Sequence, residues 1–242
     1  MATYAVHRLS GIVTPANAMY SAAELEHQLR SSGAGVLITC AALLDTALQA
    51  ARGAGIPEDR VFLMEVAELE VDAKANKTND KAKAVASSFK TLDDLVAEGR
   101  ALPALERLAW TRGQGARQTA YLCYSSGTSG LPKAVMVAHR NVIANMMQIR
   151  WHEEPGRRAA GVDGGQVLVG LLPLSHIYGL VVVANAGIYR GDGVVILPRF
   201  ELHALLSVVQ RFRVNIMHIV SFWATETWRL ATWCILEEQS FS

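Results

Sequence analysis

A polar, glycine-containing segment near the middle of the chain has the residue types that hold phosphate groups. From Ser125 to Lys133 the sequence presents four hydroxyl side chains, two glycines and one lysine within nine residues. Glycines let backbone amides approach an anion, hydroxyls donate hydrogen bonds to phosphate oxygens, and lysine adds a positive charge. The segment is therefore predicted to bind phosphate.

The spacing within this segment argues against two familiar loops. A Walker loop needs four residues between its glycines, whereas two separate Gly127 from Gly130, and Lys133 follows Pro132. A hydrolase elbow needs Gly-x-Ser-x-Gly, but here Gly130 follows Ser129 directly. A flexible Ser/Gly linker is the remaining alternative, and the apolar strand before the segment and its Leu-Pro-Lys ending disfavour it.

Several segments of the chain resemble the adenylate-forming superfamily of acyl-CoA synthetases. The similarity is greatest to 4-coumarate-CoA ligase-like enzymes, particularly those of fungi, and covers roughly Val6 to Val220. Besides the phosphate segment, it rests on Gly11-Ile12-Val13-Thr14-Pro15-Ala16-Asn17, Val137-Ala138-His139-Arg140-Asn141, Leu172-Pro173-Leu174-Ser175-His176-Ile177-Tyr178-Gly179 and Leu197-Pro198-Arg199-Phe200-Glu201. The alternative of an unrelated nucleotide-binding domain is contradicted by the spacing of residues in the phosphate segment.

The resemblance implies an ATP-dependent reaction with a small carboxylic acid, aryl or fatty, and with CoA. The acid attacks the α-phosphate of ATP to give an acyl-adenylate, and the CoA thiol then displaces AMP. Lys133 and Thr128 are expected to be catalytic, and Mg²⁺ is expected to bind through the ATP phosphates, with no direct protein ligand predicted. The residues implied in nucleotide binding are Ser125, Ser126, Gly127, Thr128, Ser129, Gly130 and Lys133.

The resemblance also implies residues for the other two substrates. His176 and Tyr178 fall at positions that line the acyl pocket, although a histidine and a tyrosine beside an apolar helix could equally be core residues. Arg199 falls where related ligases place a basic residue near the CoA phosphates.

Some parts of the family pattern are missing from this sequence. Ala134 stands where the family has glycine after the loop lysine. The ribose-binding Thr-Gly-Asp segment and the C-terminal domain with its adenylation lysine are not found, and the resemblance stops after Val220. We therefore expect a partial AMP-binding N-terminal domain over residues 1–220, a divergent tail over 221–242, and truncation at both ends. A non-catalytic pseudoenzyme or gene remnant that at most binds nucleotide or a protein partner is the alternative.

Hydrophobic periodicity and capping signals predict alternating strands and helices, and hence an α/β fold of layered βαβ units with mostly parallel sheets. Gly113-Gln114-Gly115 is read as a flexible lead into a strand. The predicted strands are Gly35 to Thr39, Val61 to Met64, Thr119 to Tyr124, Val135 to Val137, Gln166 to Leu172, Val194 to Leu197 and Asn215 to Val220. The predicted helices are Ser21 to near Gly33, Ala41 to Arg52, Thr91 to Glu98, Asn141 to Ile149, Ser175 to Ile188 and Glu201 to Phe212.

Composition narrows the function classes further. The chain has 242 residues, 51% of them hydrophobic, and a formal net charge of +1, which argues against nucleic-acid binding. Its longest apolar stretch, Ile177 to Ile188, is too short to span a bilayer.

No signal peptide is evident, and the last residues are not a Ser-Lys-Leu signal, so a cytoplasmic or peroxisomal location is expected. Cys40, Cys123 and Cys234 are assigned no chemistry.

Overall fold

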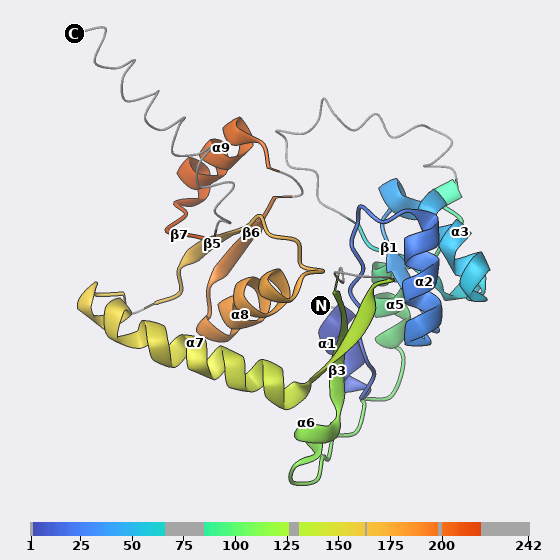
Figure 1. Cartoon of the computed structure of the whole chain (residues 1–242), viewed down its shortest axis with the longest axis horizontal. Coiled ribbons are helices and arrows are strands. Elements are labelled where there is room, and N and C mark those ends of the chain that lie inside the picture. The colour runs from blue at the N-terminus through green and yellow to red at the C-terminus, as the bar shows by residue number, and fades with distance from the viewer. Residues whose placement is uncertain (1, 66–84, 126–130, 163, 198–199, 219–242) are drawn as a thin grey trace, which may run out of the picture. The chain divides into compact units, whose positions relative to one another are not determined.

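Helices and strands alternate along the chain in the computed structural model, which describes residues 2–65, 85–125, 131–162, 164–197 and 200–218 (Figure 1). The chain divides into two compact units, Met1–Asn141 and Val142–Ser242. The predicted α/β class is confirmed, because parallel strand pairs joined through helices occur in both units.

The first unit begins with a βαβ arrangement. Strands β1 (Leu37–Thr39) and β2 (Val61–Leu63) pair in parallel. Helices α2 (Ala22–Ser32) and α3 (Leu44–Ala54) pack against each other beside them (Figure 1). The short 3-10 turns Ala41–Leu43 and Glu58–Arg60 complete the connections. The core of this part is formed by Leu25, Leu29, Leu44, Leu48, Ala50, Ala51, Ile56, Val61 and Leu63.

Helix α2 has the caps that its sequence predicts. The Ser21 side chain accepts a hydrogen bond from the backbone of Glu24, whose carboxylate in turn accepts from the Ser21 amide, forming a capping box. Gly33 ends the helix in the left-handed conformation, with φ of 66°. These bonds satisfy backbone groups that a helix end otherwise leaves without partners.

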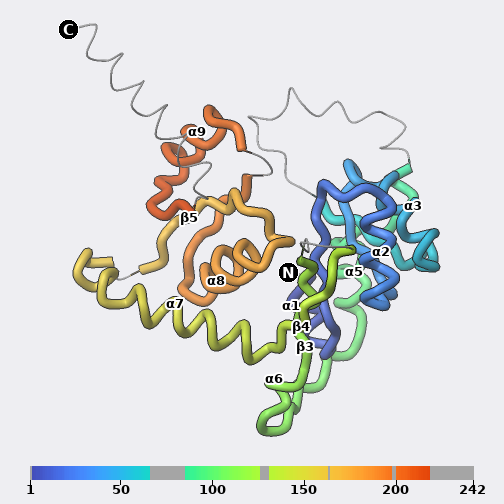
Figure 2. Tube along the Cα trace, in the orientation of Figure 1, coloured from blue at the N-terminus to red at the C-terminus, as the bar shows by residue number. Residues whose placement is uncertain are grey.

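The first unit also contains an antiparallel strand pair, β3 (Thr119–Ser125) and β4 (Lys133–Ala138), which run side by side in Figure 2. Val13 adds a parallel bridge to Tyr121. This pair departs from the mostly parallel pattern because its two strands are separated by only residues 126–132 of the sequence, whereas a crossover to a parallel strand needs a dozen residues or more.

Three further helices belong to this unit: α1 (Ala2–Arg8), α5 (Leu92–Gly99) and α6 (Gln114–Arg117). Helix α5 begins at the predicted Thr91, whose hydroxyl accepts from the Asp94 amide at 3.1 Å. The flexible lead predicted around Gly113 is wrong. Gly113 has φ of 81°, and the Gln114 side chain accepts from the Thr111 amide, so the chain turns directly into α6.

The second unit is built on a three-stranded parallel sheet. Strand β5 (Val167–Gly170) lies between β6 (Gly193–Ile196) and β7 (Ile216–Met217). Leu168 and Val169 of the central strand have no exposed surface. A strand covered on both faces reads as a continuous apolar run, which is why the sequence predicted β5 without alternation.

The helices that follow β4 match their predictions to different degrees. Helix α7 runs over His139–Ala159, well past the expected end at Ile149, and includes Pro155. The helix predicted from Ser175 is instead a π-helix over Tyr178–Asn185, followed by α8 (Ala186–Arg190). Helix α9 (Leu202–Phe212) begins as predicted, where the Glu201 carboxylate accepts from two backbone amides.

Among the described residues, no helix combines the length and apolar character that a bilayer crossing requires. The tail predicted over 221–242 lies outside the described residues.

Candidate functional site

The predicted phosphate-binding segment lies between the paired ends of two strands. Ser125, the last residue of β3, is the register partner of Lys133, the first residue of β4. Directly opposed residues of an antiparallel pair project to the same face, with Cβ atoms about 5 Å apart. Both residues are exposed. The structure therefore brings together a hydroxyl and an ammonium group at the solvent end of the hairpin.

Strand β3 carries the chain from the core to this exposed end. Tyr121 is 1% exposed and Cys123 is 7% exposed, whereas Tyr124 is half-buried and Ser125 is exposed. Burial raises the pKa of the Cys123 thiol, which keeps it protonated and unreactive at neutral pH. The buried part of the strand thus holds the polar end without contributing chemistry of its own.

The remaining predicted nucleotide and CoA residues lie outside the described residues, so their roles stay predictions. They are Ser126, Gly127, Thr128, Ser129, Gly130 and Arg199.

The two residues predicted for the acyl pocket lie together in the second unit, at the start of the π-helix that follows β5. His176 is exposed, and Tyr178 is 42% exposed. The Tyr178 amide donates to Nδ1 of His176 at 3.2 Å. The alternative that these side chains are buried core residues is therefore wrong.

The turn that contains His176 and Tyr178 leaves no room for a side chain at Gly179. A Cβ atom on Gly179 would overlap the carbonyl oxygen of Pro173. The His176 amide donates to that same oxygen at 3.0 Å. The close approach that orients His176 and Tyr178 thus requires glycine at this position.

Sequence reasoning missed His218, which follows β7. Its Nδ1 lies 3.3 Å from the Tyr178 hydroxyl, and the two rings are 5.8 Å apart. Burial lowers the pKa of His218, the positive charge of Arg190 lowers it further, and Glu153 opposes the shift. The imidazole is therefore neutral at pH 7. No motif marks this residue in the sequence, because its partner is distant along the chain.

The Arg190 guanidinium beside it belongs to a buried ion network. Arg190 donates to Asp192 at 2.6 Å and to Glu153 at 2.9 Å. The Asp192 carboxylate also accepts from the Gln166 amide. In the sequence, Asp192 reads only as part of a Gly-Asp-Gly turn. The network joins the end of α8 to α7 and to the start of β5.

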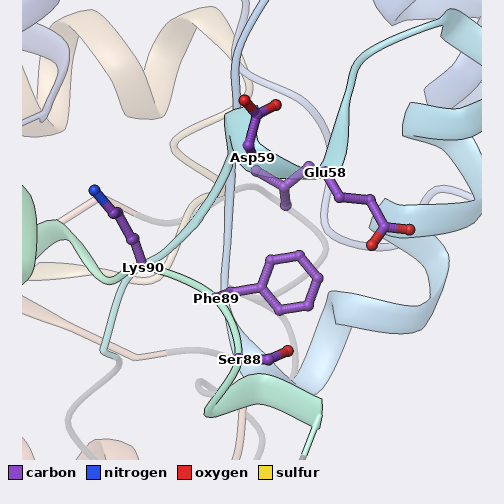
Figure 3. A pocket seen from close by; sticks show the side chains of 6 residues that line it. Glu58, Asp59, Ser88, Phe89 and Lys90 are labelled. Atoms are coloured by element: carbon purple, nitrogen blue, oxygen red, sulfur yellow. The ribbon is translucent and has the colours of Figure 1, made fainter.

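A hollow of about 310 Å³ lies elsewhere in the first unit (Figure 3). None of its lining residues is a predicted site residue. Glu58 is paired with Arg52 at 2.8 Å and Lys90 with Glu98 at 2.7 Å, so their charges are already neutralised. The hollow is lined by Glu58, Asp59, Val61, Ser88, Phe89 and Lys90.

The family model described as "AMP-binding enzyme" matches residues 1–230. The chain belongs to this family. The chain is 38% identical over 218 residues to the acyl-CoA ligase AKT1 of Alternaria alternata, covering 90% of its own length and 35% of the relative. It is 30% identical to 4-coumarate-CoA ligase 1 of Oryza sativa subsp. japonica, covering 90% of itself and 34% of that enzyme. It therefore spans about a third of the length of these curated relatives.

The fold of this chain is also found in solved structures. A red-emitting luciferase from Phrixothrix hirtus matches with a TM-score of 0.64 and 16% identity, covering 90% of this chain and 37% of the luciferase. A long-chain-fatty-acid-CoA ligase from Archaeoglobus fulgidus matches with a TM-score of 0.61 and 24% identity, covering 89% and 36%. These matches confirm the predicted family fold.

Proposed function

We propose that this AMP-binding chain contributes the phosphate-binding and acyl-binding parts of an ATP-dependent acyl-CoA ligase. The observation that carries the proposal is the pairing of Ser125 with Lys133 at the exposed end of the β3–β4 hairpin. The acyl-CoA ligases among its relatives support the reaction class. The acid is of the aryl or fatty class.

The donor set at the hairpin end fits phosphate oxygens. Ser125 offers a hydroxyl donor, and Lys133 offers an ammonium group that carries a full positive charge. Neither side chain is an oxygen-anion ligand of the kind that Mg²⁺ prefers, so Mg²⁺ is expected to enter with the nucleotide phosphates. Bound there, it would supply further charge neutralisation.

The proposed reaction has two steps. An oxygen of the substrate carboxylate bonds to the α-phosphorus of ATP, the bond from that phosphorus to the bridging oxygen breaks, and pyrophosphate leaves. The sulfur of CoA then bonds to the acyl carbon, the bond from that carbon to the phosphate oxygen of AMP breaks, AMP leaves, and the thiol proton is released to solvent. Lys133 favours the first step because it stabilises the negative charge that accumulates on the departing pyrophosphate.

His176 and Tyr178 are the proposed acyl-binding residues. Both are exposed at the start of the π-helix, and the Tyr178 hydroxyl is oriented by the neutral His218 ring. A half-exposed aromatic ring with a fixed polar tip can contact an aryl or alkyl acid while keeping its hydroxyl hydrogen-bonded. Arg199 remains the proposed contact for the CoA phosphates.

Acid-dependent pyrophosphate release tests the proposed function. The purified chain is supplied with ATP, Mg²⁺ and a panel of aryl and fatty acids, and ATP binding is measured separately by calorimetry. We expect ATP binding that Lys133→Ala weakens and acid-dependent release that Lys133→Ala abolishes, and we expect the control variant Lys90→Ala to leave both unchanged. ATP binding without release under any acid would favour the non-catalytic alternative, and absence of both would refute the proposal.

A further inference from the structure

Helix α2 contacts both strand ends that flank the phosphate-binding segment. On one side, Nε2 of His27 lies 3.2 Å from the carbonyl oxygen of Pro132, the residue before Lys133. On the other, the hydroxyl of Tyr124, the residue before Ser125, lies 2.5 Å from Oγ of Ser31. One face of a single helix thus contacts both arms of the hairpin, since positions 27 and 31 are one turn apart.

The partners of these hydrogen bonds limit which atom can donate. A carbonyl can only accept, so His27 donates from Nε2 to Pro132. Oγ of Ser31 lies 2.7 Å from the His27 carbonyl; when Ser31 donates there its oxygen accepts from Tyr124, and either hydroxyl can be the donor between the two. The Tyr124 hydroxyl also lies 3.3 Å from the Gln28 carbonyl. Every donor in this group therefore has an acceptor.

The arm that carries Lys133 depends heavily on this contact. Proline has no amide hydrogen, so the carbonyl is the only backbone group through which Pro132 can be held. Beyond it, Lys133, Ala134, Val135 and Met136 are all exposed, so packing contributes little to the start of β4. Besides its ladder with β3, the start of β4 has the bond from His27 as a polar contact.

Helix α2 is itself fixed to β3, so it can act as a reference for the hairpin. Gln28 is 1% exposed and donates to Oγ1 of Thr14 at 2.8 Å. Thr14 in turn donates to the Leu122 carbonyl of β3 at 3.1 Å, beside the bridge between Val13 and Tyr121. The capping box and the Gly33 cap keep the helix ends from fraying.

We propose that His27 and the Tyr124–Ser31 pair are positioning residues of the nucleotide site, with His27 orienting Lys133 through Pro132 and Ser31 orienting Ser125 through Tyr124. The inference rests on the proposed ATP binding. In this proposal α2, which carries none of the predicted site residues, holds the Ser125 hydroxyl and the Lys133 ammonium group at a constant separation.

Two measurements on the full chain test the inference. The first is the dissociation constant for ATP with Mg²⁺, by calorimetry. The second is the rate of tryptic cleavage after Lys133, followed by mass spectrometry without nucleotide, which reports how often the start of β4 opens. His27→Ala removes the donor, whereas His27→Gln places an amide donor near the original Nε2. His152→Ala, at an exposed position of the second unit, is the matched control.

We expect His27→Ala to weaken ATP binding and to accelerate cleavage after Lys133, each by about two- to tenfold, as the loss of one ordinary hydrogen bond predicts. His27→Gln should restore both values to within about twofold of the parent, and Tyr124→Phe should behave like His27→Ala. The midpoint of thermal unfolding should change little in all of them.

Three results would overturn the inference. Unchanged binding and cleavage in His27→Ala would show that α2 does not hold the hairpin. Equal loss of thermal stability and ATP affinity in the Ala and Gln variants would indicate a role in folding alone. Accelerated cleavage with ATP affinity unchanged would show that the anchor is real but does not serve the nucleotide. If the parent chain bound no ATP, the proposed function would fail, and the cleavage rates would still report on the anchor.

Discussion

Ser125 and Lys133 face each other across the last pair of the β3–β4 ladder. Their positions are set by strand register, because a shift of one residue would send one of the two side chains to the opposite face. The ladder runs back from this pair to Thr119 and Ala138, with one irregularity between Thr119 and Tyr121. The exposed pair is thus positioned by a strand whose other end is buried.

Replacing the lysine of this pair should weaken nucleotide binding more than any other single change at the hairpin. Lys133→Ala removes a charged donor, and such hydrogen bonds contribute about 1.5–3 kcal/mol, so we expect ATP affinity to fall about 10- to 100-fold. Lys133→Arg should keep part of the affinity because it keeps the charge. Calorimetry with ATP and Mg²⁺ measures both, and an unchanged affinity in Lys133→Ala would contradict the assigned role.

The stability of the first unit should depend on pH through two histidines that lie ring to ring. His7 and His139 have ring centroids 4.7 Å apart in an edge-to-face arrangement, with Trp110 and Tyr121 against them. Burial lowers the pKa of His7 below its ordinary 6.5, although its hydrogen bond to Ala120 opposes the shift. Burial, and then the charge of His7, lower the pKa of His139.

The sign of the effect follows from these lowered pKa values. Below about pH 6.5 the unfolded chain takes up protons at these imidazoles while the folded chain does not, so unfolding is favoured. The free energy of unfolding should be highest above that pH and decline as the pH falls through the lowered folded-state pKa values. Denaturant unfolding between pH 7.5 and 5 measures the decline. A His7→Gln, His139→Asn variant with an equally steep decline would contradict this origin.

Removing the N-cap of α2 should destabilise the first unit. Ser21→Ala abolishes the bond that the Ser21 hydroxyl accepts from the Glu24 amide, and losing such a cap costs about 1 kcal/mol. Thr91→Ala is the matched control, because α5 has the same type of box but no buried residue. We therefore expect a larger decrease in the midpoint of denaturant unfolding for Ser21→Ala than for Thr91→Ala. Equal decreases would mean that the packing of α2 does not depend on its cap.

Two glycine substitutions in the second unit should have opposite effects. Gly179→Ala forces a Cβ atom against the Pro173 carbonyl, and we expect it to cost about 1–3 kcal/mol, as overpacking does. Gly156→Ala adds a methyl group to α7 where nothing lies within 4 Å. It should stabilise the helix by about 0.5–1 kcal/mol. Thermal unfolding of both variants measures whether stability falls in Gly179→Ala and rises in Gly156→Ala. Destabilisation by Gly156→Ala would contradict the second expectation.

Local signals were sufficient for much of the fold. The capping box at Ser21 and the apolar run of β5 each involve residues within a few positions of one another, so their physical causes are visible in the sequence. The ends of the phosphate-binding segment were predicted in the same way, since Ser125 and Lys133 flank one short polar stretch.

Other features required contacts between distant residues. In the part of helix α7 that continues past Ile149, Glu153 pairs with Arg190, which belongs to another helix. His218 gained a role only through the Tyr178 hydroxyl, which lies 40 positions earlier in the chain. Such pairs carry no periodic signal, so hydrophobic patterning cannot reveal them.

The sequence by itself determined the family, the α/β class and the chemical character of the residues between Ser125 and Lys133. Only the tertiary structure decided that these two side chains face each other and that His27, 105 positions away from Pro132, is bonded to the arm that carries the lysine. The physical reason is that residue types record which bonds a group can make, whereas the folded chain decides which of the possible partners is within reach.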